Sequence, residues 1–448
     1  MRRLSLAPII KNKNNVTRMK KIRLLLLLIL VFNLTFAQQI SLKEQSIEQF
    51  KKENYSLAIN LMEKALADNP KDAEIYYYLG YFNHYNAFDS RPLKGYDSNY
   101  SQKVLSYLDK ALELNPQYGD AKYFYLTECA AVAFKEYQNE NYEKVKYYYE
   151  KAYKHGAIPE WGIELGKNIL NPCDSNAILF TSGDFPLNIC LFVQLHYEYR
   201  KDITIVPIGL LDRPSFILAL TNGVSSKIIR GLKTGLTKEQ IMDTHPYKWD
   251  TLTVHIPISN QQLKNYHLDK GFKMDWIIEP DFASNRMVSK INGEEQRKRT
   301  YLSPIRANLL NIIETNYCER PIFFTNTYED YFLAGLENYL QNCGLVSRLT
   351  PLKTENSNFK IDTKILEKIV FDTKLEKLKT IIENDQPRAS GIIGLYGYSY
   401  YQLADYYSST GEKDKLLKLI ENYKQKIMIG FKPDNENRLL NEIKKKIK

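Results

Sequence analysis

Small and bulky apolar residues recur at helical spacing through the first third of the chain, from residue 40 to residue 157. In NYSLAINLMEKALADNPKDAEIYYYLGY, a small residue is followed four positions later by a bulky one, then by Ala and Pro, and then by an aromatic residue, Leu and Gly. These residues are Ala58, Met62, Ala65, Pro70, Tyr76, Leu79 and Gly80. Because small residues let helices approach and bulky ones fill the space between them, the pattern predicts helical hairpins.

The pattern returns twice in the same third of the chain. Its residues there are Val104, Leu108, Ala111 and Pro116, and then Val145, Tyr149 and Ala152. It resembles the tetratricopeptide repeat, although the intervals of 46 and 41 residues exceed the regular period of about 34. We assign the excess in the first interval to a loop, FDSRPLKGYDSN, and interpret residues 38–157 as degenerate repeats of this kind.

The resemblance implies a concave groove that binds a peptide or another protein. Tyrosine suits such a groove, because it offers a large rigid face and a polar tip. The candidate groove residues are Tyr76, Tyr77, Tyr81 and Tyr148. Packing of one helix against another is the alternative role of each.

Between Asn171 and Pro351 the pattern changes to short apolar runs. NAILFTSGD predicts a strand, FPLNICLFVQLHYEYR a helix and KDITIVPIGLL a second strand, which together predict a parallel crossover unit. RPIFFTN predicts another strand, TYEDYFLAGLENYLQNCG a helix ending at Gly344, and LVSRLTP an element that returns to the sheet. TVHIPIS and DWIIEP predict strands, and Leu302 to Asn316 a helix. Residues 158–360 therefore predict an α/β domain with a mostly parallel sheet.

Residues 361–448 predict a helical C-terminal region. GYSYYQLADYYSSTGEKDKLLKLIENYKQKI predicts a helical hairpin that turns at Gly411. The predicted fold class is therefore mixed, with tetratricopeptide-like helices, a central α/β domain and a C-terminal helical hairpin.

Residues 1–37 predict a signal peptide. A basic segment precedes an apolar run from Leu24 to Phe32, and small residues precede a cleavage position after Ala37. The run has nine residues, against about 20 for a membrane span; an uncleaved N-terminal anchor is the alternative, and Met19 is an alternative start. No later segment approaches the length of a transmembrane span, so we expect a chain exported to the periplasm or cell envelope.

The net charge of +10 comes mostly from this leader. Residues 1–37 contain eight basic and no acidic residues, which leaves 54 basic against 52 acidic residues elsewhere. A nearly neutral body gives no reason to expect a nucleic-acid partner.

If the chain is exported, its five cysteines can form disulfides, because disulfides persist in oxidising compartments. Cys318 precedes the predicted strand RPIFFTN, and Cys343 ends the helix predicted after it. Both thiols would then lie at one end of the sheet, which predicts a disulfide between them. Cys173 would lie at that end too and could compete, and five separately buried thiols are the alternative.

ILFTSGD, RPIFFTN and GLENYLQNCGLVSRLTP resemble the soluble C-terminal portion of bacterial polytopic membrane proteins related to protein O-mannosyltransferases. The resemblance covers residues 171–355. It implies a glycan-related enzyme or a carbohydrate-binding accessory protein, although the family's transferase chemistry is expected in a membrane portion without a counterpart in this sequence. After Gly-Asp the family has further polar residues, where this chain has Phe185, Pro186 and Leu187.

Asp184 ends the first predicted strand, at the edge where α/β sheets bind ligands. With the ends of both strands it forms a candidate ligand site, which comprises Thr181, Ser182, Asp184, Thr325 and Asn326. The same position suits a helix cap, so we interpret Asp184 as a cap beside a ligand mouth.

No catalytic residue, metal site or cofactor is assigned. The histidines and cysteines lack metal-binding spacing, and neither a GxSxG elbow nor a Gly-rich phosphate loop is present. We therefore expect an exported protein that binds another envelope protein or a peptide through its helical repeats. The alternatives are the glycan-related role and a structural scaffold without a specific ligand.

Overall fold

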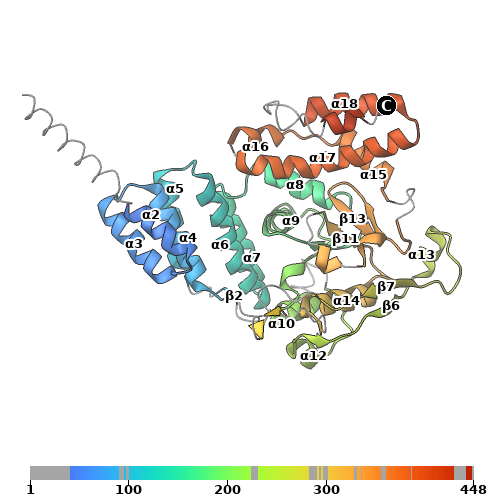
Figure 1. Cartoon of the computed structure of the whole chain (residues 1–448), viewed down its shortest axis with the longest axis horizontal. Coiled ribbons are helices and arrows are strands. Elements are labelled where there is room, and N and C mark those ends of the chain that lie inside the picture. The colour runs from blue at the N-terminus through green and yellow to red at the C-terminus, as the bar shows by residue number, and fades with distance from the viewer. Residues whose placement is uncertain are drawn as a thin grey trace, which may run out of the picture.

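The computed structural model describes most of the chain beyond the predicted signal peptide, which lies outside the described residues. The described residues are 41–89, 95–96, 100–222, 231–281, 290–291, 294–295, 301–326, 330–333, 335–354, 360–384, 386–427 and 440–445. Figure 1 shows a helical N-terminal region, an α/β domain beside it and C-terminal helices that cover one side of that domain. The predicted fold class is confirmed. Among the described residues, no helix has the length and apolar character that a membrane crossing requires.

The N-terminal region is a stack of antiparallel helical hairpins, α2–α3, α4–α5 and α6–α7. The helices are α2 Leu42–Lys51, α3 Tyr55–Asp68, α4 Ala73–Ala87, α5 Ser101–Leu114, α6 Gly119–Gln138 and α7 Tyr142–Lys154. Apart from Tyr76 and the two prolines, the residues of the recurring pattern are buried between them, as predicted. Gly80 lies so close to α5 that an added Cβ would come within 3.1 Å of Leu108. The close packing of α4 against α5 therefore favours a residue without a side chain at position 80.

The stack continues into the α/β domain through α8 Glu160–Leu170 and α9 Asp184–Tyr197, which pack against each other. Two glycines of α8 form the contact. A Cβ at Gly166 would lie 3.0 Å from the Ile189 carbonyl oxygen, and one at Gly162 would lie 3.2 Å from the Phe185 ring. Since α7 and α6 also contact α9, α9 serves both as a helix of the stack and as the crossover helix of the sheet.

The central sheet has the order β12-β13-β11-β3-β4. Its strands are β3 Ile178–Thr181, β4 Thr204–Pro207, β11 Ile322–Thr325, β12 Leu340–Asn342 and β13 Val346–Leu349. β3 pairs in parallel with both β4 and β11, whereas β13 pairs antiparallel with β11 and β12. Every residue of β3, β4 and β11 is buried, which explains why these strands are continuous apolar runs without alternation.

The other predicted strands and helices of this domain form β6 Leu252–Ile256, β7 Met274–Ile278 and α14 Pro304–Asn316, and β6 pairs with β7. The helix predicted for TYEDYFLAGLENYLQNCG is wrong. In its place lie two 3₁₀ turns, Asp330–Leu333 and Glu337–Tyr339, followed by β12. Gly335 separates the turns with φ +88°, and an added Cβ there would come within 2.5 Å of the Ile277 carbonyl oxygen.

The predicted Cys318–Cys343 disulfide is also wrong, because all five cysteines are free thiols. Cys343 lies in the turn between β12 and β13, next to the carboxyl end of β11, whereas Cys318 precedes the amino end of β11. The added strand is the reason, because the chain returns to the amino end of β11 by Leu340 and β12 then carries it back, so that Cys343 lies at the opposite end of the sheet from Cys318.

The C-terminal hairpin forms as predicted from α17 Gln386–Ser409 and α18 Lys413–Lys426, with Gly411 at φ +74° between them. The remaining described elements are short. They are β1 Phe88–Asp89, β2 Gly95–Tyr96, Ile208–Leu210 (3₁₀), α10 Pro214–Asn222, α12 Lys238–Met242, β5 Tyr247–Lys248, α13 Asn260–Asn265, β8 Lys290–Ile291, β9 Glu294–Glu295, β10 Tyr301–Leu302, α15 Thr363–Glu367, Lys368–Asp372 (π) and α16 Leu378–Asn384.

Candidate functional site

The carboxyl edge of β3 and β11 brings together most of the predicted ligand site. The parallel register places Phe180 beside Phe324, and the Ser182 amide donates a 3.1 Å hydrogen bond to Thr325 Oγ1. From β3 the chain goes first to β4 on one side and later to β11 on the other. This reversal of strand order is where open α/β sheets bind ligands.

Asp184 does not cap helix α9, so that part of the prediction is wrong. The N-cap is Gly183, with φ +85° and no side-chain cap hydrogen bond, and Asp184 lies in the first turn. Its carboxylate reaches solvent, yet surrounding protein atoms raise its pKa, while the charge of His84 acts in the opposite direction.

Thr181 and Asn326 differ from the expected picture. Thr181 is 1% exposed, and its Oγ1 has no hydrogen-bond partner among the described residues. Asn326 instead secures the β12–β13 turn, because its Nδ2 donates to the Gly344 carbonyl oxygen and its Oδ1 accepts from Ser347 Oγ at 2.7 Å. The unpartnered hydroxyl therefore lies on β3, not on β11.

Two charged neighbours of this edge were not predicted. Glu128 of α6 is fully buried and lies 2.7 Å from His84 Nδ1 of α4. His84 in turn interacts electrostatically with Asp184, which links the helical region to this edge of the sheet. Asp212 follows β4, and burial raises its pKa although Arg213 is 3.2 Å away. The signal for Glu128 was a single carboxylate inside the apolar run TECAAVA.

A stripe of aromatic rings crosses the helical region, and it contains two of the four predicted groove tyrosines. Its rings lie 4.8 to 5.8 Å apart between neighbouring centroids. The aromatic stripe consists of Phe50 on α2, Tyr77, Tyr81 and Tyr85 on α4, and Tyr118 and Phe124 at α6. Burial raises the pKa of Tyr77 and of Tyr81, so both remain protonated hydrogen-bond donors near neutral pH.

Tyr76 and Tyr148 lie outside the aromatic stripe. The Tyr76 hydroxyl donates a 3.3 Å hydrogen bond to the Pro70 carbonyl oxygen, which holds the turn before α4. Tyr148 on α7 makes a ring contact with Tyr147 at 5.2 Å. Among the described residues, no ring contact joins either tyrosine to the stripe.

A second aromatic group lines a cleft of about 430 Å³ between the helical region and the α/β domain. Phe185 lies between Trp161 and Tyr123, at centroid distances of 4.9 and 6.2 Å. The guanidinium of Arg388 from α17 lies 4.3 Å from the Tyr123 centroid and 3.3 Å from Asp120 Oδ1. Aromatic faces with charged neighbours are typical of protein interfaces.

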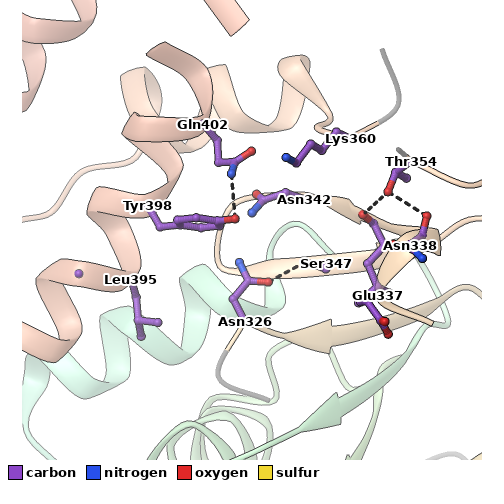
Figure 2. A pocket seen from close by; sticks show the side chains of 12 residues that line it. Asn326, Glu337, Asn338, Asn342, Ser347, Thr354, Lys360, Leu395, Tyr398 and Gln402 are labelled. Atoms are coloured by element: carbon purple, nitrogen blue, oxygen red, sulfur yellow. Dashed lines mark hydrogen bonds between the residues drawn. The ribbon is translucent and has the colours of Figure 1, made fainter. Parts of the chain in front are cut away.

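A third surface is a cleft of about 520 Å³ between the β12–β13 edge of the sheet and α17. Figure 2 shows its polar side chains, which converge from both walls. We call it the amide cleft, since four of its residues carry carboxamides. Its residues are Asn326, Glu337, Asn338, Leu340, Asn342, Ser347, Thr354 and Lys360 on the sheet side, and Gly394, Leu395, Tyr398 and Gln402 on α17.

The described residues therefore define a helical stack joined to an α/β domain with a polar cleft and no cluster of three or more potential metal ligands. A family model described as TMEM260-associated domain 2 matches residues 253–368, about a quarter of the chain. The match begins in β6 and ends after α15, so it contains Thr325, Asn326 and the sheet wall of the amide cleft, but not Asp184 or α17. No curated protein matches the chain.

Proposed function

We propose that the protein is an exported binding protein of the cell envelope, whose tetratricopeptide-like helical region holds a protein or peptide partner. The aromatic stripe is the observation that carries this proposal. It runs across α2, α4 and α6, the first helices of three successive hairpins, and in tetratricopeptide arrays a groove crosses successive repeats.

The chemistry of the stripe supports partner binding over simple packing. Tyr77 and Tyr81 are only half-buried and Tyr85 is exposed, so part of the surface of each remains accessible to a partner. Tyrosine gives contact area at a low cost in side-chain entropy. The neighbouring cleft around Phe185 extends this surface toward α8 and α9.

The decisive experiment is affinity capture of the tagged chain from its own envelope, followed by purification of the captured protein and measurement of its binding. Tyr77→Ala with Tyr81→Ala should weaken that binding by about tenfold or more, the scale of interface hot spots. Tyr147→Ala is the control, because Tyr147 is 57% exposed and no ring contact among the described residues links it to the stripe. Equal binding by all three proteins would refute the proposal.

A second candidate function is small-ligand binding at the carboxyl edge of β3 and β11. The buried, unpartnered Thr181 hydroxyl favours it, with the raised pKa of Asp184 in the same strand-end segment. The resemblance to O-mannosyltransferase-related proteins suggests a sugar as the ligand. Calorimetric titration with mannose and mannobiose should show binding that Thr181→Val weakens, and an identical absence of heat in both proteins would exclude these sugars.

A further inference from the structure

The amide cleft is long enough to hold a short segment of extended peptide. One wall is formed by Asn338, in the 3₁₀ turn before the edge strand β12, and by Leu340 and Asn342, which alternate along β12 and so face the same side. The other wall is one face of α17 from Gly394 to Gln402. The eight steps from Gly394 to Gln402 rise about 12 Å along the helix, which matches three to four residues of extended peptide at about 3.3 Å each.

The two walls offer unpaired hydrogen-bonding groups. Asn342 accepts from the Gly344 amide through Oδ1 at 2.8 Å, and its Nδ2 has no partner among the described residues. Gln402 donates to the Tyr398 hydroxyl at 2.8 Å, which leaves its Oε1 free within the described part of the chain. The Asn338 carboxamide has no partner there either. Each carboxamide can both donate and accept, as a peptide unit does.

The outer edge of β12 is partly occupied by the chain itself. The Asn342 amide donates to the Lys360 carbonyl oxygen, and the Asp362 amide donates to the Asn342 carbonyl oxygen. An incoming chain therefore cannot extend the sheet at Asn342. Recognition has to come from the side chains on the two walls.

Other ligand classes fit the described lining less well. Lys360 is its one cationic group and faces no arginine or basic cluster, which disfavours phosphates. Two leucines do not form the apolar wall that a lipid needs. Figure 2 shows the hydroxyl end of Tyr398 directed into the cleft, an arrangement for hydrogen bonding more than for stacking a sugar ring.

Gly394 leaves the helix wall open. A Cβ added there meets no atom within 4 Å, although a glycine inside a helix costs about 1 kcal/mol relative to alanine. Gly391, one turn earlier, has the same open surroundings but does not line the cleft.

We propose that the amide cleft binds an extended peptide segment by its main chain, between β12 and α17. Asn338, Asn342 and Gln402 pair with successive peptide N–H and C=O groups. Because these contacts are to the backbone, binding tolerates many side chains. The site is separate from the aromatic stripe and does not depend on the function proposed for it.

The test uses the full exported chain, immobilised, and a pool of capped random hexapeptides whose recovery is measured by mass spectrometry. Gly394→Phe fills the cleft and should reduce recovery by about tenfold or more, whereas Gly391→Phe should leave it unchanged. Gln402→Ala should also reduce recovery while the protein keeps its thermal unfolding transition, because Gln402 is only partly buried on the cleft face of α17. Tyr77→Ala with Tyr81→Ala should have no effect, which separates this site from the aromatic stripe.

A second pool of the same hexapeptides with N-methylated backbones identifies what is recognised. Weaker recovery of the methylated pool supports main-chain recognition. Equal recovery of the two pools would overturn it, and so would equal recovery by wild type and Gly394→Phe. Binding on an oligosaccharide array that Gly394→Phe abolishes, without peptide recovery, would assign the cleft to a sugar instead.

Discussion

The first helical hairpins and the central sheet are held together in different ways. Helices α2 to α4 bury a small core of their own, whose centre is formed by Ala58, Met62, Leu79 and Phe82. The sheet instead joins distant segments, since Phe180 of β3 and Phe324 of β11 stack at a centroid distance of 5.1 Å. A substitution in the first hairpins should therefore have a local effect, whereas one in the sheet should affect the main core of the molecule.

The largest effect should come from the sheet. Phe324→Ala removes a fully buried ring and should lower the free energy of unfolding by about 4 kcal/mol. Urea denaturation would measure it, and hydrogen exchange should show lost protection across β3, β4 and β11 together. Loss of protection confined to β11 would show that the strands of the sheet do not unfold together.

A smaller and more local effect is expected in the helical region. Met62→Ala empties part of the core shared by α2, α3 and α4 and should cost about 3 kcal/mol. Hydrogen exchange should rise in α2 to α4, while the β3 amides keep wild-type protection. Equal loss in the sheet would show that the two cores unfold as one.

The junction between the regions should respond to a single added methyl group. Gly166→Ala places a Cβ 3.0 Å from the Ile189 carbonyl oxygen, so α8 and α9 must separate slightly, at a cost of about 2 kcal/mol. Gly391→Ala is the matched control, because its Cβ would meet no atom within 4 Å and should stabilise α17. A Gly166→Ala protein as stable as wild type would contradict the close packing.

The smallest effect should come from Asp184. Its pKa is raised in the folded protein, so the folded state favours the protonated form, and its stabilising contribution is lost as pH rises through the folded pKa. Asp184→Asn should therefore raise the melting temperature at pH 7, and the difference from wild type should shrink below about pH 4, near the unfolded pKa. A lower melting temperature at pH 7 would show that the helix dipole outweighs desolvation.

The sequence predicted the helical hairpins and β3, α9 and β4 because their signals are local. Ala58 and Met62, for example, lie on one face of one helix, and each was recognised by its neighbours in sequence. The helix predicted for residues 327–344 failed for a non-local reason. Gly335 takes a positive φ and lies against the Ile277 carbonyl oxygen of β7, a contact that local periodicity does not contain.

The candidate site was predictable to the same extent. Thr181, Ser182 and Thr325 could be placed together, because parallel strands end at the same edge. The His84–Glu128 pair could not, since its two residues lie on different helices, 44 positions apart in sequence. The amide cleft could not be predicted either, because its wall on α17 meets β12 only through tertiary packing.

The shared position of helix α9, in both the helical stack and the sheet, determines how force passes between the two regions. The stack of hairpins ends on the same helix that crosses between β3 and β4, and the glycines of α8 hold it there at backbone distance. A load applied to a partner on the aromatic stripe therefore passes directly into the sheet. No flexible linker separates the two regions at this junction of the described chain, so they should move together as one rigid body and not as independently moving domains.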